Sequence, residues 1–293
     1  MCVEPCLKWP GGKRWLAPTL APLLAAELQG KYFEPFFGGG AVFLNIGSNN
    51  SCLSDINNDL IHFLSVVRDN PEKLIHHVWR FSNTRECYYK VRSSKPRSDL
   101  GKAARFLYLN RTAWGGIYRL NQNGEFNVPF GNSDRKICSK QSVFLFAKSL
   151  RNANIQKLDF ETAIDTSQNG DVIYADPPYT SRGQNNGFIR YNERLFSWAD
   201  QMRLAKAASR ARHRGVFVCV SGVFHRHILE LYRNWWAVRV DRTSLVARQP
   251  EHRRVFSEVI IFSRLPNSKA IRQKLDLQKI TDNLLAKIPV VCH

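Results

Sequence analysis

The sequence Asp176-Pro177-Pro178-Tyr179 directly follows the apolar run at 172–175. Each proline fixes its own φ and restricts the residue before it, so the neighbouring carbonyl and carboxylate groups are held in one arrangement. A carboxylate and a carbonyl that point the same way can both accept hydrogen bonds from one planar NH₂ group, and the tyrosine ring can stack on an aromatic ring. We interpret the four residues as a catalytic site for an amine on a base. A turn that merely ends a strand would explain the prolines but not the Asp and Tyr beside them.

A second segment that could take part in ligand binding is the glycine-rich stretch at 34–40, which contains Phe36, Gly38 and Gly40. Asp55 lies 17 residues after Gly38, at the end of the next predicted strand. Glycines let a backbone approach a ligand closely, and an acid at the following strand end can bind ribose hydroxyls. Together the two features suggest a nucleoside cofactor, although either alone is also common as plain structure.

The third segment is the loop at 8–13, Lys-Trp-Pro-Gly-Gly-Lys. A lysine and an aromatic residue on a tight glycine turn can bind the carboxylate of an amino-acid moiety and cover an apolar part of a ligand. Taken by itself, the segment is equally explained as a basic amino-terminal loop.

Short apolar runs alternate with helical patterns along the chain, which is typical of an α/β domain with a largely parallel sheet. The predicted strands are 31–35, 51–55, 154–158, 171–175, 216–220, 236–243 and 256–263. In such sheets ligands bind beyond the carboxyl ends of the strands, and the segment that begins at Asp176 follows one of these ends.

A long insert at about 65–150 separates the second and third predicted strands. Its pattern predicts helices at 71–92 and 102–113, then a Gly- and Asn-rich loop at 115–132. The insert is too long for an ordinary connection, so we expect a subdomain with its own task. The tail at 267–293 shows an amphipathic stripe, interpreted as a terminal helix that packs on the core, with a partner-binding helix as the alternative.

The formal net charge of +19 is concentrated in two blocks. Residues 65–148 hold 16 Lys and Arg against 6 Asp and Glu, and residues 201–254 hold 12 against 3, whereas the remainder is neutral. Two basic blocks suggest a surface that faces a polyanion such as nucleic acid, and two solvated helical faces are the alternative.

The composition also excludes several classes of protein. Hydrophobic residues make up 44% of the 293 residues, which argues against disorder. No apolar run approaches the ~18–20 residues that span a bilayer, and the amino terminus has no signal-peptide pattern, so a soluble, unsecreted protein is expected. The seven Cys are scattered singly, which suggests reduced thiols and no metal site.

The segments at 7–13, 34–43, 54–60, 106–131 and 171–180 together resemble the Dam-type DNA adenine-N6 methyltransferases, which use S-adenosylmethionine (AdoMet). The resemblance runs from residue 7 to about 263. It implies an AdoMet-dependent methyltransferase sheet of the Rossmann-like kind at 1–64 and 150–265, a mainly helical target-recognition subdomain at 65–149, and a helical tail at 266–293. It also implies a cytoplasmic enzyme of bacterial or phage origin.

The resemblance assigns cofactor and catalytic roles residue by residue. Asp176, Pro177, Pro178 and Tyr179 match the catalytic tetrapeptide. Nine positions match the family's AdoMet-binding residues: Trp9 and Lys13 of the amino-terminal loop, Phe36, Gly38 and Gly40 of the glycine turn, Asp55 for the ribose, Asp159 and Phe160 for the adenine, and Asp176.

The resemblance also assigns DNA-binding positions within the insert. These are Arg111, Trp114, Arg119 and Pro129, of which Arg119 and Pro129 match positions associated with reading the sequence GATC. The family pattern has Asn after the aromatic residue, whereas Gly115 and Gly116 follow Trp114 here. This departure concerns the target sequence and not the chemistry. Arg119 could bind either a guanine edge or a phosphate.

The implied reaction is methyl transfer to the N6 amine of an adenine flipped out of duplex DNA. Downstream of the tetrapeptide, Phe188, Tyr191 and Phe196 either close the base pocket or belong to the core. Two other functions fit the same residues less well: an RNA or protein-amide methyltransferase, and a DNA-binding regulator without catalysis. A restriction endonuclease that acts independently is a possible partner in function.

Overall fold

The structure is a computed structural model that describes residues 5–121, 123–131, 137–179, 196–243, 255–268 and 275–288. It divides into two compact units, Met1–Pro22 with Phe37–Leu158 and Leu23–Phe36 with Asp159–His293. Helix α1 (Ala17–Glu27) contains the boundary at Pro22. The predicted α/β class is confirmed, because the described residues form eight strands, two in the first unit and six in the second, together with helices in both units.

The first unit is mainly helical. Its strands, β2 and β3, pair in parallel, with Cys52 opposite Asn154. Its elements are α2 (Ala41–Ile46), β2 (Ser51–Asp55), α3 (Asn58–Asp69), α4 (Pro71–Val78), α5 (Arg85–Ser93), α6 (Asp99–Thr112), the 3₁₀ turn η1 (Trp114–Gly116), α7 (Lys140–Leu150) and β3 (Asn154–Lys157).

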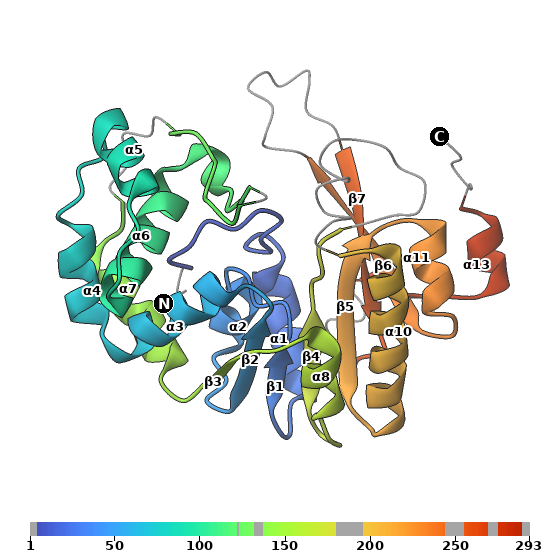
Figure 1. The fold of residues 1–293 in the computed structure, drawn as a ribbon. Helices are drawn as coiled ribbons and strands as arrows, with labels where there is room; N and C mark the ends of the chain where they lie inside the picture. The colour runs from blue at the N-terminus through green and yellow to red at the C-terminus, as the bar shows by residue number, and fades with distance from the viewer. Residues whose placement is uncertain are drawn as a thin grey trace. The chain divides into compact units, whose positions relative to one another are not determined.

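The predicted helix at 71–92 is wrong as one continuous element, because the structure has α4 and α5 with a turn at 79–84 between them (Figure 1). Polar residues explain the break. Ser82 binds Thr84, and the Thr84 side chain caps α5 by accepting from the Cys87 N–H, so the chain stops and restarts a helix there. The other predicted helix is found as α6, capped by Ser98.

A buried aromatic cluster holds α5, α6 and the loop that follows them. It contains Tyr88 of α5, Tyr108 of α6 and, from the loop, Phe126 and Val128. The Tyr88 hydroxyl also donates to the Val128 carbonyl over 2.8 Å. The Gly- and Asn-rich loop therefore has a fixed inner side, which leaves its outer side available for a ligand.

The second unit is built on a mixed sheet of strand order β1-β4-β5-β7-β6-β8. The pairs β1–β4 and β4–β5 are parallel, whereas β5–β7, β7–β6 and β6–β8 are antiparallel, so the expected largely parallel sheet is parallel only in its first half. Its strands are β1 (Tyr32–Glu34), β4 (Val172–Ala175), β5 (Phe217–Val223), β6 (Trp236–Thr243), β7 (Val255–Phe262) and β8 (Gln278–Lys279). All seven predicted strands of the chain are present, and β8 is additional.

The helices of the second unit are α8 (Phe160–Asp165), α10 (Trp198–His213), α11 (Arg226–Leu231) and α13 (Asp282–Ala286). Helices α8 and α10 lie side by side (Figure 1), and α10 packs on β5 through buried Leu204, Ala207 and Ala208. Ser197 and Asp200 form a capping box that begins α10.

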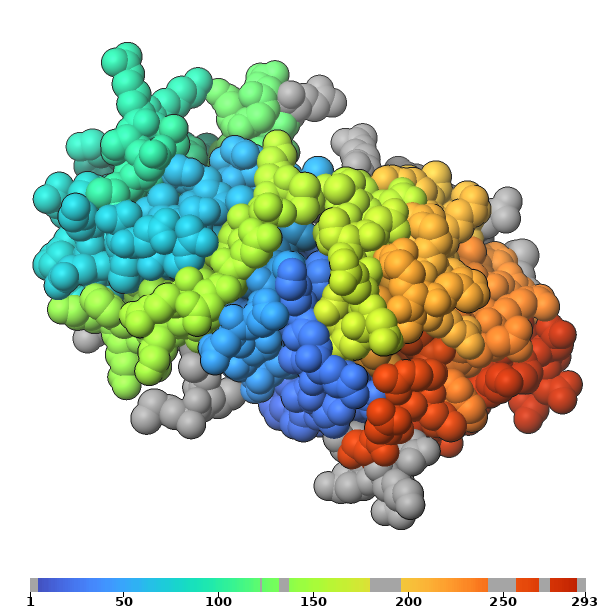
Figure 2. Space-filling model, turned by 90° about the horizontal axis from the view of Figure 1, so that it is seen from below, coloured from blue at the N-terminus to red at the C-terminus, as the bar shows by residue number. Residues whose placement is uncertain are grey.

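The predicted single helix of the tail is wrong for residues 275–288, which form the edge strand β8 and then the short α13. The interpretation that the tail packs on the core is confirmed there: Ile280 and Leu285 are buried, and α13 contacts α11, visible as the red surface beside orange in Figure 2. Ile271 lies outside the described residues. No helix in the described ranges is long and apolar enough to cross a membrane.

Candidate functional site

The tetrapeptide predicted to be catalytic begins where β4 ends, in the second unit. Asp176 is half-buried, and its Oδ1 accepts a hydrogen bond from the Ser221 hydroxyl over 2.6 Å. The Tyr179 hydroxyl donates to Glu258 Oε2 over 2.8 Å. Burial, followed by the charges of Asp176 and Glu258, raises the pKa of Tyr179 well above its ordinary value, so the phenol stays protonated and remains a donor. The segment thus has a carboxylate and an aromatic ring, each held by a neighbouring strand.

An aromatic cluster in the same unit brings together two of the residues predicted to bind the cofactor. The rings of Phe36 and Phe160 stack with centroids 5.3 Å apart, and Phe196 contacts both rings. Phe196 is only 3% exposed, in agreement with the core interpretation of this residue. The other two aromatic residues predicted near the base pocket, Phe188 and Tyr191, lie outside the described residues.

Asp159 begins α8 beside this cluster. Its Oδ1 accepts from the Glu161 N–H over 3.0 Å and from the Arg203 guanidinium over 2.8 Å. Arg203 also lies over the Phe160 ring at 4.7 Å, so it fixes both residues of the predicted adenine-binding pair.

In the first unit, the amino-terminal loop and the glycine turn meet. Gly38 has φ +50°, and a Cβ on it would lie 2.8 Å from Trp9 Cδ1, closer than real contacts allow. Gly40 has φ +68° and precedes α2, where a side chain would overlap the Phe37 ring. Glycine is therefore required at both positions, and at Gly38 the reason is the indole of another predicted site residue.

Asp55 is tied to the same turn. Its Oδ2 accepts from the Gly38 N–H over 3.1 Å and its Oδ1 from the Asn57 N–H over 2.9 Å. Burial raises the pKa of Asp55, and the hydrogen bonds from Asn57 and Gly38 oppose that shift. Each carboxylate oxygen has a second lone pair, so the group can still accept a ligand hydroxyl. Lys13, only 3% exposed, donates to the Gly11 carbonyl over 2.7 Å.

Three of the four residues predicted to bind DNA lie on the loop that follows α6. The Trp114 N–H donates to the Pro129 carbonyl over 2.9 Å, and the Arg119 Nε donates to Asn127 Oδ1 over the same distance. Trp114 is 54% exposed, and Arg119 and Pro129 are also exposed. The structure thus brings three of the four predicted residues together on one exposed hairpin.

The fourth, Arg111, is held inside the unit. Its guanidinium donates to the backbone carbonyls of Ile137 over 2.7 Å and Cys6 over 3.4 Å, and the residue is half-buried. In this geometry Arg111 joins α6 to the backbone at Cys6 and Ile137, so its guanidinium has a structural role.

The two glycines that depart from the family pattern differ in how strictly the structure requires glycine at each position. Gly115 has φ +63° and only ordinary contacts around its Cβ position, a conformation that Asn also tolerates. Gly116 has φ +66° and lies against Lys8, whose side chain a Cβ would overlap. Only Gly116 is therefore fixed by packing.

The two basic blocks also differ in the structure. Several arginines of 201–243 bind acids of the second unit, most of which lie outside this block. The pairs are Arg203 with Asp159, Glu161 and Asp200, Arg210 with Glu161 and Asp165, Arg226 with Glu230, Arg233 with Asp282, and Arg239 with Asp241. The sequence count of this block overstates its free positive charge.

Within the described residues of the first block, several cations have no carboxylate partner. These are Lys73, Arg80, Arg85, Lys90, Arg92, Arg97, Arg105, Arg119 and Lys148. This block is therefore the better candidate for contact with a polyanion.

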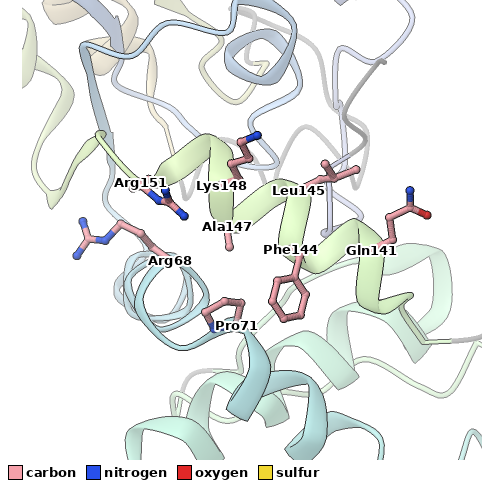
Figure 3. Close-up of a pocket in the computed structure, with 8 residues that line it drawn as sticks. All are labelled: Arg68, Pro71, Gln141, Phe144, Leu145, Ala147, Lys148 and Arg151. Atoms are coloured by element: carbon pink, nitrogen blue, oxygen red, sulfur yellow. The ribbon is translucent and has the colours of Figure 1, made fainter.

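A hollow of about 380 Å³ lies between α3, α4 and α7 of the first unit (Figure 3), where Phe144 points toward Pro71. Three cations border it: Arg68, which pairs with Asp69 at 2.7 Å, and Lys148 and Arg151, which have no carboxylate partner among the described residues. The lining contains no carboxylate and none of the predicted site residues. We therefore do not assign the reaction to this hollow.

Sequence reasoning missed Ser221, Glu258, Arg203 and Asn110. Ser221 is a single polar residue inside an apolar run and Asn110 directly follows one, and that pattern is a signal for a buried hydrogen-bonding task, though not for its partner. Glu258 and Arg203 had no comparable signal, because charged residues are common on strands and helices that face solvent on one side.

Comparison with known proteins gives a consistent result. The model of the D12 class N6 adenine-specific DNA methyltransferases matches residues 9–246. The Type II methyltransferase M1.LlaDCHI of Lactococcus lactis subsp. cremoris is 33% identical over 270 residues, covering 88% of this chain and 95% of that protein. The DNA adenine methylase of Escherichia coli K12 is 31% identical over 237 residues, covering 78% and 83% of the two chains. The DNA N-6-adenine-methyltransferase of Escherichia phage P1 is 35% identical over 234 residues, 78% of this chain and 31% of that protein.

Proposed function

Because the chain belongs to the D12 class of N6 adenine-specific DNA methyltransferases, we propose that it methylates a flipped adenine within a short duplex motif. The class and the reaction are those of an adenine-specific DNA methyltransferase with S-adenosylmethionine as methyl donor.

The residues present fit this donor. In the first unit, Asp55 offers carboxylate oxygens for ribose hydroxyls, and Trp9 lies on the glycine turn at Gly38. In the second unit, the stacked rings of Phe36 and Phe160 offer an aromatic surface for an adenine ring. Lys13, Gly40, Asp159 and Asp176 complete the proposed set. When bound, S-adenosylmethionine supplies a methyl group on an already activated sulfonium.

The fixed carboxylate of Asp176 is the observation that carries the proposed mechanism. The lone pair of an adenine amine is delocalised into the ring, which makes the amine a poor nucleophile. Asp176 and the Pro177 carbonyl would accept the two amine hydrogens and so localise the lone pair toward the incoming methyl group. The Tyr179 ring would stack on the flipped base, and Pro178 would hold the tyrosine in place. The protein contributes mainly position, which can account for several kcal/mol of a barrier.

For DNA recognition we propose residues 65–149 as the target-recognition subdomain, with the exposed hairpin of Trp114, Arg119 and Pro129 as its reading surface. Support comes from the exposure of these residues and from the buried cluster that anchors the opposite side of the loop. GATC is the first motif to test, because Arg119 and Pro129 match positions associated with it. Gly115 supplies no side chain where the family pattern has Asn, so a different or relaxed motif is the alternative outcome.

Cations of the first block that have no carboxylate partner would contact phosphates. Binding should then weaken with salt with a log–log slope of roughly −0.9 per phosphate contacted. The paired arginines of the second block would add little to that slope, since their charges are already compensated.

One similar protein is named a Type II methyltransferase, so a restriction endonuclease acting on the same motif is the partner to test. If such a nuclease exists, DNA from cells that carry the methyltransferase should resist cleavage by it. A bacterial or phage enzyme that acts on cytoplasmic DNA is the expected setting.

The testing experiment is methyl transfer from labelled S-adenosylmethionine to unmethylated DNA, followed by modification-sensitive sequencing. We expect N6-methyladenine at one short motif. Asp176→Ala should keep DNA binding and lose transfer even at saturating S-adenosylmethionine, and near-normal transfer by this variant would overturn the role of Asp176. Methylation scattered over many adenines would overturn the site specificity.

A further inference from the structure

Two buried side chains from neighbouring strands hold the catalytic tetrapeptide by its functional groups. Ser221 of β5 is fully buried and donates to Asp176, and Glu258 of β7 is 6% exposed and accepts from Tyr179. We infer that Ser221 and Glu258 are positioning residues of the methyl-transfer reaction. Ser221 would fix the rotation of the Asp176 carboxylate, and Glu258 would fix the plane of the Tyr179 ring. The inference rests on the proposed catalytic roles of Asp176 and Tyr179.

The sheet register brings Ser221 to the level of Asp176. Strands β4 and β5 are parallel, with Tyr174 opposite Cys219 and Ala175 opposite Val220, so Ser221 is next in line with Asp176. The four residues of β5 before Ser221 are apolar and buried. A hydroxyl in such surroundings is costly unless it is hydrogen-bonded, and here its bond is made to a carboxylate.

The Ser221 hydroxyl has a donor of its own. Tyr174 OH lies 3.1 Å from Ser221 Oγ. Burial, followed by the charge of Asp176, raises the pKa of Tyr174, so its phenol stays protonated. Tyr174 can thus donate to Ser221. The single serine proton has two acceptors in reach, Asp176 Oδ1 at 2.6 Å and the Ala175 carbonyl at 3.4 Å, and the shorter bond to the carboxylate is the stronger one. With Oδ1 bound in this way, the other carboxylate oxygen has a defined direction in which to accept an amine hydrogen.

Glu258 acts at the other end of the tetrapeptide. It lies on β7, opposite Val223 of the antiparallel strand β5. Prolines 177 and 178 restrict the backbone of the tetrapeptide, and Glu258 binds the tip of the following tyrosine ring. A ring held at both its backbone and its hydroxyl presents a constant face to a stacked base.

The first test compares Ser221→Ala with Ser221→Thr. We expect Ser221→Ala to lower the single-turnover rate constant of methyl transfer about 10- to 100-fold, because a charge-assisted hydrogen bond to the reacting carboxylate is lost. The dissociation constants for S-adenosylmethionine and DNA should change less than about threefold, and Ser221→Thr should recover most of the rate. Ser263→Ala is the matched control. Ser263 is equally buried and accepts from the Val218 N–H over 3.0 Å, so its loss should lower stability without lowering the rate.

The second test is a double-mutant cycle of Tyr179→Phe and Glu258→Ala. Each change should lower the transfer rate and weaken binding of DNA that carries 2-aminopurine at the target position. The double variant should be no slower than the slower single variant, since both changes remove the same bond. Glu258→Gln keeps an acceptor and should recover most of the activity.

The results distinguish this inference from the function on which it rests. A wild-type protein that methylates no adenine would overturn the proposed function. A wild-type protein that is active, together with a folded Ser221→Ala variant whose rate is within twofold of it, would overturn the role of Ser221. If Ser221→Ala does not fold, Ser221→Cys keeps the volume with a weak donor, and an unchanged rate in that variant has the same meaning. Fully additive effects in the cycle would overturn the role of Glu258.

Discussion

Asn110 binds both backbone polar groups of Lys8. The Lys8 N–H donates to Asn110 Oδ1 over 2.8 Å, and Asn110 Nδ2 donates to the Lys8 carbonyl over 2.7 Å. Asn110 is fully buried on α6, and the Lys8 ammonium reaches the Arg111 carbonyl over 3.1 Å. The loop that carries Trp9 is therefore fixed to the helix that leads into the proposed DNA-reading hairpin. The proposed cofactor loop and the proposed DNA-reading hairpin thus share this attachment.

Asn110→Ala should destabilise the protein by about 2–4 kcal/mol, because two backbone groups lose their partner in a buried place. It should also weaken binding of S-adenosylmethionine, since Trp9 is next to the released Lys8. Urea unfolding and calorimetric titration measure the two effects. Asn49→Ala, at an exposed asparagine, is the control and should change neither. Unchanged stability in Asn110→Ala would show that the attachment is dispensable.

Gly38→Ala should lower the affinity for S-adenosylmethionine at least tenfold. The new Cβ would meet the Trp9 indole at 2.8 Å and force it to move, in addition to the strain of a positive φ. Gly47→Ala is the matched control, because Gly47 has φ +67° with open space around it. It should lose about 1–2 kcal/mol of stability from the backbone alone and keep its affinity. Equal affinity losses in the two variants would mean that strain, and not the indole contact, decides binding.

The sequence predicted the residues proposed for the chemistry better than it predicted the buried residues that hold them in place. Asp176 and Tyr179 could be found because the prolines between them mark a rigid segment after a strand. Ser221 is visible only as a polar residue inside an apolar run, and its partner could not be predicted because that partner depends on the register between β4 and β5, which has no local signal in the chain. Prediction from residue patterns thus reached the groups proposed to act and missed the side chains that bind them.

The charge count and the apolar periodicity each gave one wrong expectation, for different physical reasons. The excess positive charge at 201–254 suggested a free basic surface, but Arg203 and Arg210 bind acids of α8, some 40 residues earlier in the chain. The apolar periodicity across 71–92 predicted one helix because it gives no sign that the Thr84 side chain caps the start of α5 and so divides the segment into two helices. The first error arises because a local charge count does not include distant partners, and the second because apolar periodicity does not include polar capping groups.

Stability should fall in acid through the loss of the Glu161 ion pairs. Hydrogen bonds from Arg210, and then from Arg203, hold the pKa of Glu161 below its ordinary value of 4.5. A carboxyl whose pKa is lowered by folding stabilises the protein above that ordinary value, and the stabilisation disappears as the pH falls through the folded pKa. Thermal unfolding between pH 6 and 3 should therefore show a decline in Tm below about pH 4.5.

Glu161→Gln should lower the Tm at pH 6 and reduce its decline in acid. Glu72→Gln is the control, because Glu72 is 66% exposed on its side chain and lies 3.8 Å from Lys140, so it should behave like the wild type. A Glu161→Gln variant with the full wild-type decline would place the acid sensitivity elsewhere in the protein.

Arg119→Ala should relax the sequence preference of the enzyme. The Arg119 Nε is held by Asn127, and among the described residues no acceptor binds its two terminal nitrogens, so the guanidinium can pair with a guanine edge. Loss of such a pair is worth about 1–3 kcal/mol, so binding to the methylated motif should weaken about 5- to 150-fold while binding to unrelated DNA changes little. Arg80→Ala removes an exposed cation that has no carboxylate partner in the described residues, and should instead weaken binding to every sequence equally and reduce the salt slope by about one. Competition binding with motif and scrambled duplexes at several salt concentrations separates these outcomes. A uniform loss and a reduced slope in Arg119→Ala would assign Arg119 to a phosphate and leave base reading to the rest of the hairpin.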